Sequence, residues 1–223
     1  MNPVISRLIL KDWRLHRRLI IACSLTGIGA LALVRFGNES ARLFGAVWFF
    51  VALIVLGAML PSTAILNERK KQTLAFLMSL PVSSLHYTIA KITSLWTMFL
   101  LPWLALLVAA VLFVNASHTI PHGVIPMLII LAMLPVLGFS LIASATLVGE
   151  SEGWLMGASL LCNSSYWFVW YLLSRIPSLT DHWGDSLPVW NTAARTVLSA
   201  ELSVIVLIVA VTLFLQSRKR DFI

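Results

Sequence analysis

Three histidines and an aspartate are of the residue types that bind metal ions. His118 and His122 are four residues apart, and His182 follows Asp181. Imidazole and carboxylate groups bind zinc when three or four of them converge. Pro121 interrupts the helix that would align the first two histidines. We therefore interpret these side chains as solvated loop residues and predict no metal site.

Motifs for catalysis are absent from the sequence. It contains no Gly-x-Ser-x-Gly elbow, no His-Glu-x-x-His helix and no Gly-x-x-x-x-Gly-Lys-Ser/Thr loop. A chain without a phosphate-binding loop of this kind does not hydrolyse ATP as the P-loop ATPases do. We therefore predict that this chain is not an enzyme and holds no cofactor of its own.

The most distinctive segment is a basic, proline-stopped stretch between two long uncharged runs. Residues 68–80 can continue the preceding helix, Pro81 stops it, and Ser83 or Ser84 can cap a new helix running through Lys91. We call residues 68–91 the elbow. Its distinguishing residues are Glu68, Arg69, Lys70, Lys71, Thr73, Leu74, Leu77 and Pro81. A rigid protrusion of this kind can receive force from a partner protein.

The composition around the elbow is that of a membrane protein. Of 223 residues, 59% are hydrophobic and 11% are charged, against roughly 25% charged in soluble domains. A membrane span needs about 20 apolar residues. One all-α transmembrane domain over residues 1–223 is therefore predicted, with six transmembrane helices. The expected spans are 19–36, 43–67, 92–114, 124–148, 154–174 and 197–217, with a short loop at 149–153, an outer segment at 175–196 and a tail at 218–223.

Residues 1–18 are predicted to form an amphipathic interfacial helix. On a helical wheel, six apolar residues from Val4 to Leu15 share one half and five cations from Arg7 to Arg18 share the other, although Asp12 and His16 fall on the apolar side. An ordinary basic segment next to the membrane is the alternative. A cleavable signal peptide is disfavoured because the charged region is too long.

The distribution of cations predicts the orientation. With the N-terminus inside, twelve of the sixteen Lys and Arg residues lie in the cytoplasm, and Arg35, Arg42, Arg175 and Arg195 lie outside. Both termini are then cytoplasmic. This topology and contact with anionic membrane lipid account for the net charge of +7, so we predict no binding of nucleic acid.

Polar and small residues inside the spans are candidates for a pathway or for helix packing. The densest polar cluster is Asn163, Ser164, Ser165 and Tyr166, and Ser62 and Thr63 follow Pro61. The cluster is interpreted either as interhelical hydrogen bonding or as substrate contact. Gly149, Gly153 and Gly157 favour close helix approach. Glu201 is expected near the end of a span. No charged residue is expected deep in a span, and this argues against a proton-coupled transporter.

The elbow resembles the matching loop of permease subunits of type-2 ATP-binding-cassette (ABC-2 type) exporters. The shared pattern is Glu68, basic residues 69–71, Thr73, the leucines, Pro81, Ser83 and Lys91, with Gln72 where the family usually has glycine. The six spans, the amphipathic N-terminal helix and the short loop at 149–153 are similar to that family as well. A plain basic inner loop is the alternative interpretation of the elbow.

The resemblance implies how such a chain would work. It implies an exporter in the plasma membrane, the inner membrane of a bacterium, built as a homodimer or with a paralogous permease. Two copies of an ABC ATPase would carry ATP and Mg²⁺ and contact the elbow together with Glu150 and Glu152. Leu74 and Leu77 would insert into the ATPase, and the pathway would lie at the second and fifth spans. An intramembrane enzyme is disfavoured because the sequence offers no paired set of catalytic groups at one depth in the membrane. A membrane interaction scaffold, such as an immunity or sensor protein, remains an alternative.

Overall fold

A computed structural model describes residues 3–66, 84–117, 120–149 and 151–218 of the chain. Regular structure in these ranges is entirely helical, as the sequence predicts. The long helices are α1 (Pro3–Phe36), α2 (Glu39–Pro61), α5 (Ser84–Asn115), α6 (Ile125–Gly149), α7 (Glu152–Ser174) and α9 (Thr192–Arg218). Three short elements are the π-helix η1 (Ser62–Leu66), the 3-10 turn η2 (His122–Val124) and α8 (Pro177–Thr180).

Within the described ranges, five helical segments are long and apolar enough to cross a membrane. They are Ile9–Phe36, Glu39–Ile65, Ile89–Asn115, His122–Gly149 and Thr192–Arg218. These agree with five of the six expected spans. The remaining expected span is α7, whose 23 residues extend about 35 Å at 1.5 Å per residue. It is long enough but less apolar than the other five, so the count of six spans stays a prediction.

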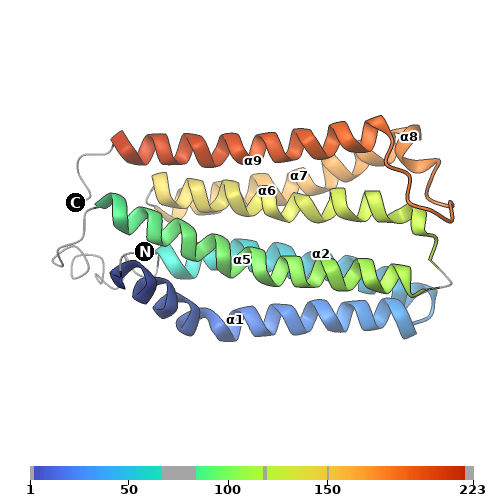
Figure 1. The fold of residues 1–223 in the computed structure, drawn as a ribbon, viewed down its shortest axis with the longest axis horizontal. Coiled ribbons are helices and arrows are strands. Elements are labelled where there is room, and N and C mark those ends of the chain that lie inside the picture. Colours follow the sequence, from blue (N-terminus) through green and yellow to red (C-terminus); the bar gives the residue numbers. More distant parts are fainter. Residues whose placement is uncertain (1–2, 67–83, 118–119, 150, 219–223) are drawn as a thin grey trace.

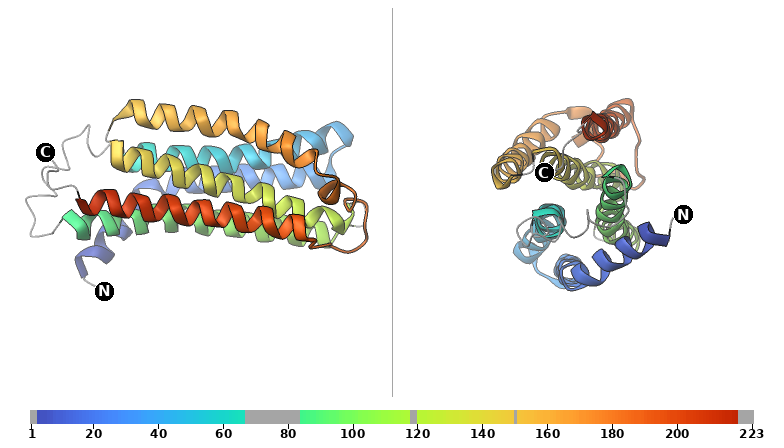
Figure 2. Two further views of the ribbon diagram at one scale, coloured as in Figure 1. Left: turned by 90° about the horizontal axis from the view of Figure 1, so that it is seen from above. Right: turned by 90° about the vertical axis from the view of Figure 1, so that its left-hand side faces the viewer.

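Helix α6 is the centre of the bundle. It contacts α2, α5, α7 and α9, whereas α1 packs on α2 and α5. The end-on view in Figure 2 places α6 in the middle, with α1 on one side and α7 and α9 on the other. Phe139 of α6 stacks on Phe99 of α5 with ring centroids 4.3 Å apart. The core therefore forms around a helix that has no charged residue.

Helix α1 differs from the expected interfacial helix followed by a separate span. It is continuous from Pro3 to Phe36, and its first part is inclined to the rest (Figure 1). Asp12 and His16 are buried, and Trp13 packs against the main apolar cluster. The side predicted to rest on lipid thus contacts protein between Asp12 and Ile20, and a separate amphipathic helix on the membrane surface is not confirmed.

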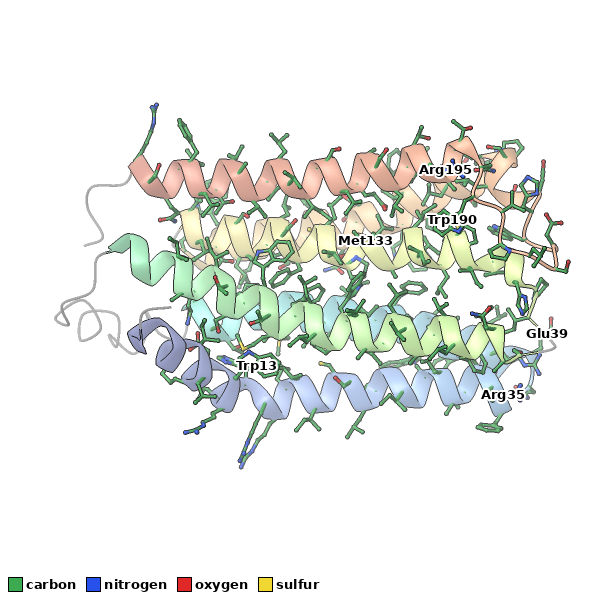
Figure 3. All side chains as sticks on the ribbon, in the orientation of Figure 1. Trp13, Arg35, Glu39, Met133, Trp190 and Arg195 are labelled. Carbon is green, nitrogen blue, oxygen red and sulfur yellow. The ribbon has the colours of Figure 1, made fainter. Side chains whose placement is uncertain are left out.

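The helix termini gather at two ends of the bundle. One end, which we call the base, holds the beginnings of α1 and α5 and the ends of η1, α6 and α9 (Figure 1). Arg35, Glu39, Trp190 and Arg195 lie at the opposite, far end (Figure 3). There, Leu179 of α8 packs with Trp183 and Trp190 over Met127 and Ala194. This small apolar cap joins α6, α7 and α9.

Helix boundaries follow local sequence signals. The side chain of Asn38 caps α2 by accepting from the Ala41 N–H at 3.0 Å. Helix α5 begins at Ser84 and runs without interruption through Lys91, as predicted. Helix α9 begins at Thr192, five residues before the expected start at 197. After Pro61, the Thr63 hydroxyl donates to the carbonyl of Met59 at 2.7 Å, rather than to that of Gly57, which loses its donor to the proline.

Candidate functional site

The central part of the elbow lies outside the described residues. This applies to Glu68, Arg69, Lys70, Lys71, Thr73, Leu74, Leu77 and Pro81, so their assigned contacts with an ATPase stay predictions. The structure describes the two elements between which these residues lie. We call η1 and the first two turns of α5 the roots of the elbow. Both are at the base of the bundle (Figure 1).

The first root and the part of α5 just beyond the second root are buried in one apolar cluster. Ala64 and Ile65 of η1 are buried there, and so are Leu95 and Met98 of α5, just beyond the second root. The same cluster includes Ile20 of α1 and, partly buried, Trp13. Figure 3 shows Trp13 in the inclined first part of α1, near the base. The elbow therefore emerges from a packed foundation to which three helices contribute.

A buried ion pair joins α1 to the second root. The ammonium group of Lys91 lies 3.1 Å from Oδ2 of Asp12, and both side chains are 4% exposed. One residue further along α1, the Trp13 indole N–H donates to the hydroxyl of Thr97 at 3.4 Å. The His16 ring is hydrogen-bonded to the backbone carbonyl of Asp12 at 2.9 Å. Polar bonds thus accompany the apolar contact between α1 and α5.

The short loop between α6 and α7 is described in part. Glu150 lies outside the described residues, whereas Glu152 is exposed in the first turn of α7. A Cβ on Gly149 would lie 2.2 Å from the Trp154 ring. Glycine at this position therefore lets the indole close over the end of α6. The loop is as short as expected and lies at the base with the roots of the elbow.

The two residues of the second span that were predicted to line a pathway directly precede the elbow in the sequence. Ser62 and Thr63 belong to η1 and are half-buried. Short π-helical segments often occur at functional sites because they break the regular hydrogen-bond ladder. The Thr63 hydroxyl is occupied by its own helix, through the bond to Met59. Ser62 and Thr63 are therefore better placed to shape the first root of the elbow than to line the middle of a pathway.

The polar cluster of α7 is split between two faces. Tyr166 turns inward, where its hydroxyl donates to the Leu134 carbonyl of α6 at 3.5 Å. Asn163 and Ser165 are exposed and donate to carbonyls one turn back on α7, at Ser159 and Leu161. Ser164 is exposed as well. Of these four residues, Tyr166 alone makes an interhelical hydrogen bond within the described part of the chain.

The outward face of α7 carries two glycines that lie beside no other described helix. A Cβ on Gly157 would meet no atom within 4 Å, and one on Gly153 would meet only Ser151 at 3.8 Å. At 100° per residue, Ser164 lies on the same face as both glycines. The expected close packing at Gly153 and Gly157 is therefore wrong within a single chain. Ala158 and Cys162, on the opposite side of α7, pack against Ile142 of α6 instead.

Sequence reasoning missed a polar seam between α6 and α9. The Thr212 hydroxyl donates to that of Ser144 at 2.7 Å, and the Gln216 side chain donates to the Leu147 carbonyl at 2.8 Å. Glu201 is buried on the same face of α9. The signal was available, because residues 201, 212 and 216 share one helical face at 100° per residue. Asp12 on an otherwise apolar face was a similar signal for the pair with Lys91.

The candidate metal ligands do not converge. Within the described ranges, no three His, Cys, Asp or Glu side chains are grouped so that they could hold a metal ion. His182 pairs instead with Asp185 at 2.8 Å, in the segment that covers the far end. His118 lies outside the described residues.

Comparison with known proteins identifies a family. The family described as ABC-2 family transporter protein matches residues 7–218, which include nearly all of the helices from α1 to α9. No curated protein and no solved structure matches the chain.

Proposed function

The chain belongs to the ABC-2 family of transporter proteins, and from that premise we propose that it is the permease of an ATP-driven exporter, working as a dimer. The observation that carries this proposal is the family match over residues 7–218, which takes in the whole helical bundle. Apolar helices long enough to cross a bilayer are consistent with a multi-pass permease subunit of an ABC transporter.

The motor is on a separate polypeptide. The sequence has no nucleotide-binding loop, and active export needs the free energy of ATP hydrolysis. We propose two copies of an ABC ATPase, each supplying ATP and Mg²⁺ to the complex and each docking on one permease. In this arrangement the permease contributes the pathway and the surface that receives force.

The elbow is the proposed docking surface for the ATPase. Its leucines, Leu74 and Leu77, would insert into the ATPase, while Glu68 and the basic residues 69–71 would make charged contacts at the rim. Glu150 and Glu152 would contribute from the short loop. The buried packing of the first root, and of α5 just beyond the second root, supports this proposal, because a lever transmits force only if its foundation is rigid.

Co-purification with an ATPase encoded beside the permease tests the proposal. We expect the wild-type chain to form a stable complex that hydrolyses ATP faster than the ATPase alone. Leu77→Asp should abolish complex formation or stimulation, because a carboxylate does not enter an apolar socket without a large desolvation cost. Leu187→Asp, an exposed leucine of the segment at the far end, is the matched control and should leave both unchanged.

The alternative function is an interaction scaffold without transport activity. It would be favoured if the wild-type chain, correctly inserted in membranes, bound no ATPase. If the complex formed and Leu77→Asp left both binding and stimulated hydrolysis intact, the elbow would lose its assigned role while the permease assignment would stand.

The second and fifth spans are the proposed pathway and dimer seam. In the described part of the chain, helix α7 packs mainly on α6, and its outward face carries Asn163, Ser164 and two glycines. Lipid tails offer no hydrogen-bond partners to such groups. A second copy of the chain would bring two such faces together as a homodimer, and a paralogous permease would do the same.

A double substitution tests the pathway role of α7. Asn163→Leu with Ser164→Ala removes both exposed polar groups while keeping the helix. If these residues contact cargo, we expect transport to change its preference among substrates, with complex formation retained. Unchanged substrate preference in reconstituted vesicles would remove the pair from the pathway.

The base of the bundle is proposed to face the cytoplasm. The cations of the first part of α1, and Lys91 of α5, belong to segments near that end, and the sequence adds further cations in the elbow and the C-terminal tail, as the positive-inside rule requires. Both termini are then inside, and anionic lipid of the inner leaflet surrounds the base.

A further inference from the structure

The ion pair between Asp12 and Lys91 connects elements that are far apart in the chain. Asp12 is in the inclined first part of α1, and Lys91 is seven residues into α5, about two turns from its start. The Lys91 ammonium lies 3.1 Å from Oδ2 of Asp12, and the Lys11 ammonium lies 3.5 Å from Oδ1. The pair is therefore a bond between the second root of the elbow and α1.

The pair is not needed to hold the helices together. Apolar packing already joins them, because Trp13 and Ile20 of α1 share a cluster with Leu95 and Met98 of α5. Buried ion pairs contribute little net stability, because desolvation of both charges offsets their attraction. What such a pair adds is geometric specificity, since its hydrogen bond fixes one helix relative to the other.

The position of the pair suggests what that specificity serves. Among the described residues, the first root, η1, is held to the cluster by the buried apolar side chains of Ala64 and Ile65. The second root is held by the directional bond from Lys91. The N–H of Trp13 donates to Thr97, about 1.7 turns beyond Lys91 along α5, so α1 is bonded to α5 at two successive levels.

We propose that the Asp12–Lys91 pair is the joint that makes the first turns of α5 and the first part of α1 move as one body. The inference rests on the proposed function in one respect, namely that an ATPase displaces the elbow. Displacement of the second root is then passed to α1, and through α1 to α2, on which it packs. Asp12 and Lys91 are positioning residues in this scheme.

Distance measurement on the permease alone tests the joint directly. Spin labels replace the exposed residues Leu15 on α1 and Ile89 on α5, in a background without Cys23 and Cys162. We expect one narrow distance distribution in the wild-type chain, a broadened one in Asp12→Asn and in Lys91→Gln, and a narrow one again in the charge swap Asp12→Lys with Lys91→Asp. Arg14→Gln removes an exposed cation near Asp12 on α1 and should leave the distribution narrow.

Stimulated ATP hydrolysis tests the consequence for coupling. We expect Asp12→Asn to retain the complex with the ATPase but to lower stimulation roughly tenfold, within the usual range for energetic coupling between sites. The swap should recover most of it. If Asp12→Asn does not accumulate in membranes, Lys91→Gln and the swap carry the same comparison.

Each outcome decides the proposal. An unbroadened distribution in Asp12→Asn and Lys91→Gln overturns the joint. A broadened distribution with undiminished stimulation overturns its role in coupling. If the wild-type chain binds no ATPase, the proposed function fails, and the distance measurement still upholds or overturns the joint by itself.

Discussion

At the level of single residues, the contact between α6 and α7 depends on the absence of one side chain. A Cβ on Gly138 would lie 2.1 Å from the Tyr166 hydroxyl oxygen and 3.2 Å from Cζ of the same ring. The tyrosine therefore lies in space that any other residue at position 138 would occupy. Small residues commonly permit such close approach in membrane helices.

Gly138→Ala should destabilise the bundle through this overlap. We expect a loss of about 1 to 3 kcal/mol, the usual cost of overpacking, measured as a lower melting temperature in detergent. Tyr166→Phe should cost little by itself, because the hydroxyl bond is long at 3.5 Å. Combined, the two substitutions should recover most of the loss, because the atom that the new methyl group meets is gone. Gly29→Ala, where a Cβ meets nothing, is the control.

Glu201 is a second residue whose surroundings matter. It was expected near a span end, but α9 begins at Thr192, which puts Glu201 nine residues, about 14 Å, from the helix start. Its side chain is buried, and Oε2 has no hydrogen-bond partner among the described residues. An acid so placed is costly in a membrane and often functional. Glu201 therefore lies deeper in its span than expected, and α9 does not fit the expectation that no acid lies deep in a span.

At the level of elements, α7 is the least integrated of the long helices. It lies at the edge of the bundle in the end-on view (Figure 2) and packs mainly on α6. Leu160, Leu161 and Trp167 flank the small residues of its outward face and are exposed. A groove of small residues between large apolar ones is the arrangement that pairs membrane helices. This is the physical basis for assigning α7 to the dimer seam.

Gly157→Leu should weaken the dimer. The leucine would fill the shallow stripe through which a second α7 approaches, and we expect a loss of roughly 1 to 2 kcal/mol of association free energy. The association free energy is measured from the oligomeric mass of the protein in nanodiscs over a series of concentrations. Gly29→Leu places the same side chain at another exposed glycine, on α1, and should leave the mass unchanged. A Gly157→Leu chain that stayed dimeric to the same dilution would contradict the α7 seam.

At the level of the whole molecule, the described cations are divided between the two ends. Lys11, Arg14, Arg17, Arg18, Lys91 and Arg218 belong to helix segments toward the base, and Arg35, Arg42, Arg175 and Arg195 to segments toward the far end. The elbow and the tail add five more cations to the base side of the sequence, and Arg7 of α1 is a sixth. The asymmetry favours a cytoplasmic base, because positively charged loops are retained inside.

Cysteine labelling tests this orientation. Cysteines at the exposed positions Ser186, in the far-end segment, and Ser217, near the end of α9, are compared in intact cells with a membrane-impermeant maleimide. We expect Ser186→Cys to react from outside and Ser217→Cys to react only after permeabilisation. The unaltered chain is the control, because Cys23 and Cys162 are both buried. Reaction of Ser217→Cys in intact cells would reverse the topology.

Much of the fold was predictable because hydrocarbon imposes simple rules on a chain. Long uncharged runs predicted helices close to those observed, such as 124–148 for α6 and 154–174 for α7, since only helices satisfy their own backbone bonds over such lengths. The helix running through Lys91 into the third span agrees with α5, whereas the proline stop before it lies outside the described residues. The polar contacts between helices were less predictable. A single residue such as Asp12 departs from the apolar pattern of its helix face, but the sequence does not show which residue it pairs with.

The sequence by itself determined the class of the protein, its helices and the position of the elbow, because apolar length, charge placement and proline are local properties of the chain. The tertiary structure alone decided which faces meet. It placed Asp12 against Lys91 and turned Tyr166 toward Gly138, and it left no described atom within 4 Å of a Cβ on Gly157. Such pairings join residues from separate helices, and they depend on how whole helices rotate and pack, which no local pattern specifies.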